Sequence, residues 1–206
     1  NKKKKIKGPF FEFFSFALNK TIVKFRKKKI VKNKKNINVF VNFGSSDPKQ
    51  FTHKVLRYFE NLNLSKQLDF KILLGPGFSK IEKKRINHYQ KKYQIYHNLS
   101  NRNLNSLRSS SDLSIISGGS LMIENIFLNL PSLVIPTSNS EKLISNYFKK
   151  KGMVIQINKL NEKKFRKNLN IALKFKHRKN IFKNLKKNNK DFNKSLAYLM
   201  RFLRKN

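Results

Sequence analysis

The sequence predicts an α/β protein, with a Rossmann-like doubly wound parallel sheet of about six strands and a helical C-terminal tail. Two observations carry this prediction. From Ile37 onward, short apolar runs alternate with amphipathic stretches, which is the pattern of strand–helix–strand units. The 206 residues, of which 38% are hydrophobic, are enough to bury one sizeable core. Helices between consecutive strands favour parallel pairing in a single open sheet.

Each expected strand is a short apolar run bounded by turn residues or polar residues. INVFVNF and DFKILL are rich in β-branched and aromatic residues, and QIYH, SLVIP and MVIQI are shorter runs of the same kind. LSIIS is almost continuously apolar, as expected for a strand buried on both faces of a parallel sheet. The six strands are expected at 37–43, 69–74, 94–97, 113–117, 132–136 and 153–157.

Helices are expected where apolar residues recur every three or four positions. They are placed at 49–62, 79–92, 103–111, 121–130 and near 141–151. The apolar face expected for the first of these helices consists of Phe51, Val55, Leu56 and Phe59. The face expected for the fourth consists of Ile123, Ile126, Phe127 and Leu130.

We expect three segments along the chain: a basic linker or entry segment at 1–36, a Rossmann-like domain at 37–160 and a basic helical tail at 161–206. The tail carries one apolar stripe, which we expect to pack against the sheet and which is made of Leu196, Leu199 and Leu203. Because the first residue is Asn rather than Met, we expect the chain to be a fragment whose true start lies upstream.

The net charge of +38 comes from 48 Lys and Arg residues against 10 Asp and Glu residues. Such a charge commonly indicates nucleic acid or an anionic membrane as a partner. Here the lysines flank nearly every expected element, whereas nucleic-acid-binding proteins usually concentrate their charge on one face. We therefore expect no specific nucleic acid, and only weak association with anionic membrane surfaces. The alternative from another class is a basic module that docks on RNA or anionic lipid through 27–35 and 161–206.

The chain contains no cysteine, which excludes disulfides, thiolate metal sites and cysteine nucleophiles and fits a reducing cytoplasm. Its longest aromatic-apolar run, FFEFFSFAL at 10–18, is under half the roughly 20 residues that a membrane-spanning helix needs. We therefore expect a cytoplasmic protein without a spanning segment.

The candidate ligand loops follow the strands, because ligands of such sheets collect beyond the carboxyl ends of the strands. Gly118-Gly119-Ser120 follows the buried run LSIIS. The missing side chains of the two glycines let backbone N–H groups and the next helix N-terminus face a phosphate. Ser120 can cap that helix and offer its hydroxyl to the same ligand. The alternative interpretation is a tight turn with a serine cap and no ligand.

Glu124 lies four residues after Ser120, on the same helix face and about one turn away. A carboxylate at this position can accept two hydrogen bonds from a vicinal diol such as that of a ribose. The alternative is a surface glutamate that pairs with a lysine and contributes little.

The other loops carry weaker signals. Gly75-Pro76-Gly77 begins like a dinucleotide fingerprint, but Lys80 stands where the third glycine is needed, and no P-loop pattern occurs. The four histidines form no metal or triad pattern, and only His97 ends a strand near the expected site. Asp47 follows Gly44-Ser45-Ser46 and fits an Asp-Pro turn. We expect no metal site and no cofactor, and the catalytic residues stay unknown.

Five segments, taken in order and spacing, resemble a known family. They are FGSSDP at 43–48, LLGPGFSK at 73–80, YHNLSN at 96–101, SDLSIISGGSLMIEN at 111–125 and LPSLVIP at 130–136. They resemble the C-terminal half of the UDP-2,4-diacetamido-2,4,6-trideoxy-β-L-altropyranose hydrolases of pseudaminic-acid biosynthesis. That family is similar to GT-B glycosyltransferases of the peptidoglycan lipid-linked type, whose C-terminal domains define family 28. GPFFEFFSFAL at 8–18 resembles the segment that joins the two halves.

The resemblance implies the nucleotide-binding half of a UDP-sugar hydrolase, which releases UDP from an amino-sugar donor in surface-glycan biosynthesis. The enzymatic alternative is the C-terminal domain of a GT-B glycosyltransferase that transfers a hexosyl group from a UDP-sugar. In both cases the partner is a UDP-sugar, and a separate or missing N-terminal domain completes the enzyme. Since the family's catalytic histidine belongs to that domain, we expect this chain alone to be inactive.

The resemblance also implies site residues. The diphosphate would be held by the backbone amides of Gly118, Gly119 and Ser120. The ribose hydroxyls would bind Glu124, and the uracil would bind the main chain near Leu99. The cleft would be lined by Gly44, Ser45, Ser46 and Gly75.

Three positions depart from the family pattern. Gly44-Ser45 stands where the family has paired glycines, and Leu121 stands where a small or hydroxylated residue is usual. Ser140-Glu141 stands where an Asn-Gln pair is usual, which weakens the expected sugar or diphosphate contacts.

Overall fold

The six-stranded parallel sheet predicted from the sequence is confirmed in a computed structural model, which describes residues 20–26, 33–62 and 68–188. The strands are β1 (Ile37–Asn42), β2 (Leu68–Leu74), β3 (Gln94–His97), β4 (Leu113–Ile116), β5 (Ser132–Val134) and β6 (Ile155–Gln156). Their spatial order is β3-β2-β1-β4-β5-β6, and every neighbouring pair is parallel. The chain therefore builds outward from β1 to one edge and then returns to build from β4 to the other. The point of reversal lies between β1 and β4, where open sheets of this kind form a crevice.

A helix occurs at each of the five expected positions, but the one expected at 121–130 ends at Phe127, so Leu130 lies beyond it. The helices are η1 (Lys20–Phe25), α2 (Phe51–Asn61), α3 (Lys80–Asn87), η3 (His88–Lys91), α4 (Asn101–Ser110), α5 (Ser120–Phe127), α6 (Asn139–Lys150) and α7 (Glu162–Leu173). A further helical segment covers 175–188. The single basic helix expected at 79–92 is divided, because α3 ends at Asn87 and a 3-10 turn follows. At its start, Ser79 and Glu82 form a reciprocal capping box.

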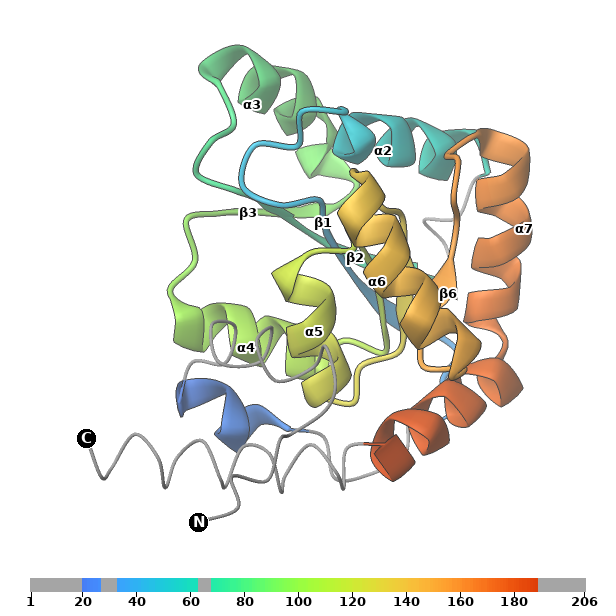
Figure 1. The fold of residues 1–206 in the computed structure, drawn as a ribbon. Helices are drawn as coiled ribbons and strands as arrows, with labels where there is room; N and C mark the ends of the chain where they lie inside the picture. Colours follow the sequence, from blue (N-terminus) through green and yellow to red (C-terminus); the bar gives the residue numbers. More distant parts are fainter. Residues whose placement is uncertain (1–19, 27–32, 63–67, 189–206) are drawn as a thin grey trace.

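The helices cover both faces of the sheet, as Figure 1 shows. Successive residues of β1 alternate between two hydrophobic clusters: Val39 and Val41 belong to one, and Phe40 belongs to the other. The first cluster packs the sheet against α2, η3 and α7. The second packs it against α5, α6 and the 175–188 helix. This two-sided burial explains why the central strands are apolar on both faces.

The described part of the C-terminal tail, which extends to residue 188, packs against the sheet. On α7, Phe165 and Leu169 are fully buried in the first cluster, together with Phe59 of α2. Leu185, on the 175–188 helix, is buried in the second cluster. The chain therefore crosses from one face of the sheet to the other between these helices. The stripe of Leu196, Leu199 and Leu203 lies outside the described residues.

The segment before β1 also contacts the domain. Ile22 of η1 is 1% exposed and packs with Phe127, Leu128 and Leu130 at the end of α5. The Arg26 guanidinium lies 5.0 Å from the centroid of the Phe127 ring. Residues Ile22 and Arg26 of the expected entry segment are thus held at the C-terminal end of α5. Within the described ranges, no helix combines the length and the apolar character needed to cross a bilayer.

Replacing Phe59 with alanine should lower the free energy of unfolding by about 3–5 kcal/mol. The Phe59 ring is fully buried and stacks on Phe70, with centroids 3.8 Å apart, so its loss leaves a cavity between α2 and the sheet. Urea unfolding followed by circular dichroism measures the effect. Leu143→Ala is the control, because this side chain is 72% exposed and its truncation should cost less than about 0.5 kcal/mol. Equal losses in the two variants would contradict the packing described here.

Candidate functional site

The Gly118-Gly119-Ser120 segment lies at the carboxyl end of β4, beside the point where the strand order reverses. Helix α5 begins at Ser120, and its N-cap residue is Gly119 in an extended conformation. No side chain caps this helix end, so the expected role of Ser120 as a cap is wrong. Instead Ser120 is exposed as the first helical residue. The N-terminus of α5 is therefore open to an anion from outside the helix.

One carboxylate of the protein already lies against this segment. Glu141, in the first turn of α6, accepts a hydrogen bond from the Gly118 amide through Oε2, at 3.2 Å. The same oxygen accepts bonds from the Thr137 amide at 2.6 Å and from the Thr137 hydroxyl at 2.8 Å. A Cβ atom at Gly119 would lie 3.1 Å from Glu141 Oε1. Both oxygens of Glu141 thus face the double glycine.

Glu124 does not pair with a surface lysine. Its Oε2 lies 2.5 Å from Nη2 of Arg108 on α4, whose side chain is 1% exposed. Burial lowers the pKa of Arg108, and the opposite charge of Glu124 raises it. The Glu124 side chain itself is 19% exposed, so the carboxylate reaches both the buried arginine and the surface. A ribose hydroxyl would have to share this carboxylate with Arg108.

A buried polar network continues inward from this ion pair. Nη1 of Arg108 donates to Oδ1 of Asn125 at 3.4 Å, and Nδ2 of Asn125 donates to the Ser114 hydroxyl of β4 at 2.9 Å. The Ser114 hydroxyl donates in turn to that of Ser132 on β5 at 2.8 Å. Because these groups are removed from water, each needs its partner. The network therefore fixes α4 and α5 relative to the centre of the sheet.

The loops after β1 and β2 are in contact with one another. The buried Asn42 side chain donates to a main-chain carbonyl of β2 and accepts from the Gly44 amide, both at 2.9 Å. The Gly77 amide donates to the Ser45 carbonyl at 2.9 Å. A Cβ atom at Gly75 would lie 2.4 Å from Cα and from the carbonyl oxygen of Ser45. Glycine at position 75 is thus required by the close approach of the two loops.

Parts of the loop after β1 are exposed. Ser45 and Ser46 are exposed, and Gly44 has a φ of 97°, which favours glycine. Leu99 follows β3 and packs against the second hydrophobic cluster, which also holds Leu121 at the start of α5. The structure therefore places the Leu99 loop and α5 on the same face of the sheet.

A polar pocket lies next to the double glycine, at the carboxyl ends of β5 and β6. It is lined by Lys49, Pro136, Thr137, Ser138, Asn139, Lys142 and Asn158. Two of these residues are lysines and two carry hydroxyl groups, which suits the recognition of an anionic or polyhydroxylated ligand. Thr137 connects this pocket to Gly118, since it bonds the same oxygen of Glu141.

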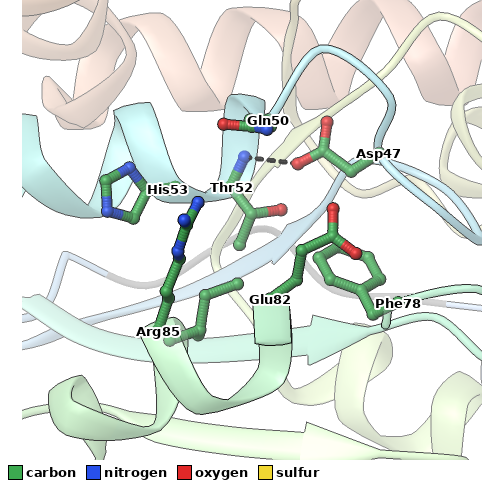
Figure 2. Close-up of a pocket in the computed structure, with 8 residues that line it drawn as sticks. Asp47, Gln50, Thr52, His53, Phe78, Glu82 and Arg85 are labelled. Carbon is green, nitrogen blue, oxygen red and sulfur yellow. Dashed lines mark hydrogen bonds between the residues drawn. The ribbon is translucent and has the colours of Figure 1, made fainter. Parts of the chain in front are cut away.

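Another pocket lies between the first turn of α2 and α3, as Figure 2 shows. Here Asp47 is 1% exposed and accepts bonds from the amides of Phe51 at 2.9 Å and Thr52 at 2.6 Å. Burial raises the pKa of Asp47. Its two oxygens hold the start of α2, in agreement with the turn interpretation. Burial, together with the charges of Arg57 and Arg85, lowers the pKa of His53, so its ring is neutral at pH 7.

The described residues contain no cluster of three or more His, Cys, Asp or Glu side chains that could hold a metal ion. His97 lies at the end of β3, at one edge of the sheet. It is three strands away from β4 in the sheet order, a distance of about 14 Å at normal strand spacing. His97 is thus not brought to the double glycine.

Comparison with solved structures identifies the architecture. The chain superposes on MurG of Acinetobacter baumannii with a TM-score of 0.59 and 11% identity, covering 76% of this chain and 46% of MurG. It superposes on WaaG, a glycosyltransferase involved in lipopolysaccharide biosynthesis, with a TM-score of 0.58, 13% identity and coverage of 84% and 47%. The fold is that of a GT-B glycosyltransferase domain.

A third structure is itself a single domain. The C-terminal CMP-Kdo binding domain of WaaA from Acinetobacter baumannii matches with a TM-score of 0.56 and 15% identity. The match covers 75% of this chain and 89% of that domain. The architecture in this chain therefore has about the extent of that single domain.

The sequence comparisons are sparser. No protein-family model matches the chain. The uncharacterized protein MJ1062 of Methanocaldococcus jannaschii is 31% identical over 137 residues, which cover 64% of this chain. The matched region spans 27% of MJ1062, so this chain corresponds to about a quarter of that protein's length.

Sequence reasoning missed two contributors to the site, Arg108 and Glu141. Arg108 sits in a helix of polar residues, and its burial could not be read from that pattern. Glu141 was noticed only as a departure from a family pattern. The spacing of Ser138 and Glu141 is that of a capping box, and the Ser138 hydroxyl does accept from the Glu141 amide at 3.2 Å. The Glu141 carboxylate, however, bonds Thr137 and Gly118, which a local pattern does not predict.

Replacing Glu124 with alanine should lower the free energy of unfolding by about 3 kcal/mol, because it leaves the buried Arg108 charge without its partner. Glu124→Gln should cost clearly less, since an amide oxygen still accepts from the guanidinium. Urea unfolding of both variants measures the difference. An alanine variant as stable as the unmodified chain would show that the pair does not anchor α5.

Replacing Gly75 with alanine should destabilise the protein by about 2 kcal/mol, because the added methyl group overlaps the main chain of Ser45. Gly77→Ala is the matched control: its nearest contact would be the Ser46 side chain at 3.0 Å, which can shift more easily. Thermal unfolding compares the two variants. A Gly77→Ala loss equal to or larger than that of Gly75→Ala would contradict the loop contact.

Proposed function

We propose that this chain is the nucleotide-sugar-binding domain of a GT-B glycosyltransferase, with a UDP-sugar as donor. The observation that carries the proposal is the open N-terminus of α5, which follows two glycines at the switch point of the sheet and has no side-chain cap. Such helix ends bind phosphate through backbone amides and the helix dipole. The match to the CMP-Kdo binding domain of WaaA, 89% of which is covered, supports a domain of this extent in the same role.

Each part of the donor has a proposed location. The diphosphate is assigned to the amides of Gly119 and Ser120, next to the Gly118 amide that Glu141 occupies. The ribose is assigned to the Glu124 carboxylate, whose side chain is 19% exposed, and the uracil to the main chain near Leu99. The loops at Gly44 to Ser46 and at Gly75 are assigned to the cleft, and their mutual contact holds them together. The sugar is assigned to the adjacent polar pocket that Lys49 and Lys142 line.

A UDP-sugar hydrolase of the pseudaminic-acid type is the second candidate. The segments SDLSIISGGSLMIEN and LPSLVIP favour it, because they resemble that family in order and spacing. Both candidates use the same donor half and differ in the acceptor, which is water in one case and a hydroxyl compound in the other. Both reactions need a base and stabilisation of the departing diphosphate. We assign only the second of these to this chain and expect no turnover from the chain alone.

Isothermal titration calorimetry with UDP tests the proposal. We expect saturable one-to-one binding with a dissociation constant below about 1 mM, corresponding to roughly 4 kcal/mol of binding free energy. Gly119→Val should abolish binding, because a branched side chain beside Glu141 Oε1 covers the amides. Lys142→Gln should weaken binding several-fold, whereas Lys167→Gln, an equal charge change on an exposed residue of α7, should not.

Two results would contradict the assignment of this site. One is the absence of UDP binding at millimolar concentration. The other is binding that Gly119→Val leaves unchanged in a variant shown by circular dichroism to be folded. A steep salt dependence of binding to random-sequence RNA, with saturation at one site, would instead favour the basic nucleic-acid-binding alternative.

A further inference from the structure

The Glu141 carboxylate occupies part of the anion site that the double glycine forms. Its Oε2 accepts three hydrogen bonds: one from the Gly118 amide at 3.2 Å and two from Thr137 at 2.6 and 2.8 Å. Three donors on one oxygen hold the side chain in this place. The Gly118 amide is therefore already bonded to a negative charge that belongs to the protein.

The two glycines allow this approach. A Cβ atom at Gly118 would lie 3.0 Å from both Cβ and the carbonyl oxygen of Glu141. A Cβ atom at Gly119 would lie 3.1 Å from Oε1 of Glu141. The backbone of α6 thus packs closely on one glycine, and the second carboxylate oxygen faces the other. Any group bound at the Gly119 amide will have Oε1 of Glu141 as a close neighbour.

The Glu141 carboxylate should act differently on the donor, a UDP-sugar, and on the product, free UDP. In a UDP-sugar, the distal phosphate is a diester and carries one negative charge. In free UDP, the same phosphate is terminal, and with a second pKa of about 6 it carries nearly two negative charges at neutral pH. A fixed carboxylate repels the second form more strongly. The carboxylate can also accept a hydrogen bond from a hydroxyl of the transferred sugar, a group that free UDP lacks.

We infer that Glu141 is a specificity-determining residue that weakens the binding of free UDP relative to the sugar-esterified nucleotide. This inference rests on the proposed nucleotide-sugar site. The functional consequence is that UDP, the product, dissociates more readily than the UDP-sugar donor. The cost is that the Gly118 amide, which Glu141 occupies, no longer contributes to holding the ligand.

Glu141→Gln tests the inference, because the amide keeps the size and one acceptor of the side chain but removes the charge. Calorimetric titrations of the full chain with UDP and with UDP-N-acetylglucosamine give the two affinities. We expect the substitution to raise the affinity for UDP roughly tenfold and that for UDP-N-acetylglucosamine less than about threefold. At about pH 5.5, where the terminal phosphate has taken up a proton, the gain for UDP should shrink.

Asp69→Asn is the matched control. Asp69 lies near the start of β2, at the opposite edge of the sheet from the ligand loops, and bonds Gln94 through an oxygen that asparagine retains. The Asp69→Asn substitution removes the same charge as Glu141→Gln and should change the affinity for neither nucleotide by more than about twofold. If Glu141→Gln folds poorly, Glu141→Ser removes the same charge with a smaller side chain, and its two affinities decide in the same way.

The outcomes separate this inference from the proposed function. If both nucleotides bind and Glu141→Gln changes their affinities equally, or changes neither, Glu141 does not discriminate and the inference is overturned while the binding site stands. If neither nucleotide binds to the unmodified chain or to the variant, both the site and the inference are overturned. A selective gain for UDP that is lost at low pH supports both.

Discussion

The buried ion pair between Arg108 and Glu124 is the interaction on which the candidate site depends. Arg108 is 1% exposed, and a charge in that position needs a partner at close range, which Glu124 supplies at 2.5 Å. Asn125 extends the contact from α5 into the sheet through Ser114. Helix α5, with the double glycine before it, is therefore held by buried polar contacts as well as by apolar packing. Loss of any one of these contacts leaves a buried polar group without its partner, which is costly.

This arrangement gives Glu124 two roles that compete for one carboxylate. Its contact with Arg108 anchors α4 to α5, and its side chain stays 19% exposed. A ligand hydroxyl can bond the carboxylate without breaking the pair, since a carboxylate offers about four acceptor positions. Loss of ligand binding after truncation of Glu124 would thus combine a missing contact with a displaced helix. Only a substitution that keeps the acceptor, such as glutamine, separates these two effects.

The parts of the structure that the sequence predicts are the local ones. Each strand is a contiguous apolar run, and Phe51, Val55, Leu56 and Phe59 of α2 are all buried as their spacing requires. The turn at the double glycine is equally local, because it joins β4 to α5. The strand order was not predictable in this way, since pairing β1 with β4 brings together segments that lie far apart in the sequence. For the same reason the burial of Arg108 could not be read from its largely polar helix.

Glu141 shows most clearly why the remaining part of the site was missed. It lies 23 residues from Gly118, and only the pairing of β4 with β5 brings α6 against the start of α5. Its position also answers a difficulty posed by the net charge of +38. A chain with 48 basic residues attracts every polyanion, so attraction alone cannot distinguish one phosphate compound from another. Discrimination then requires a local repulsive group, and a carboxylate fixed at the double glycine is placed to provide it.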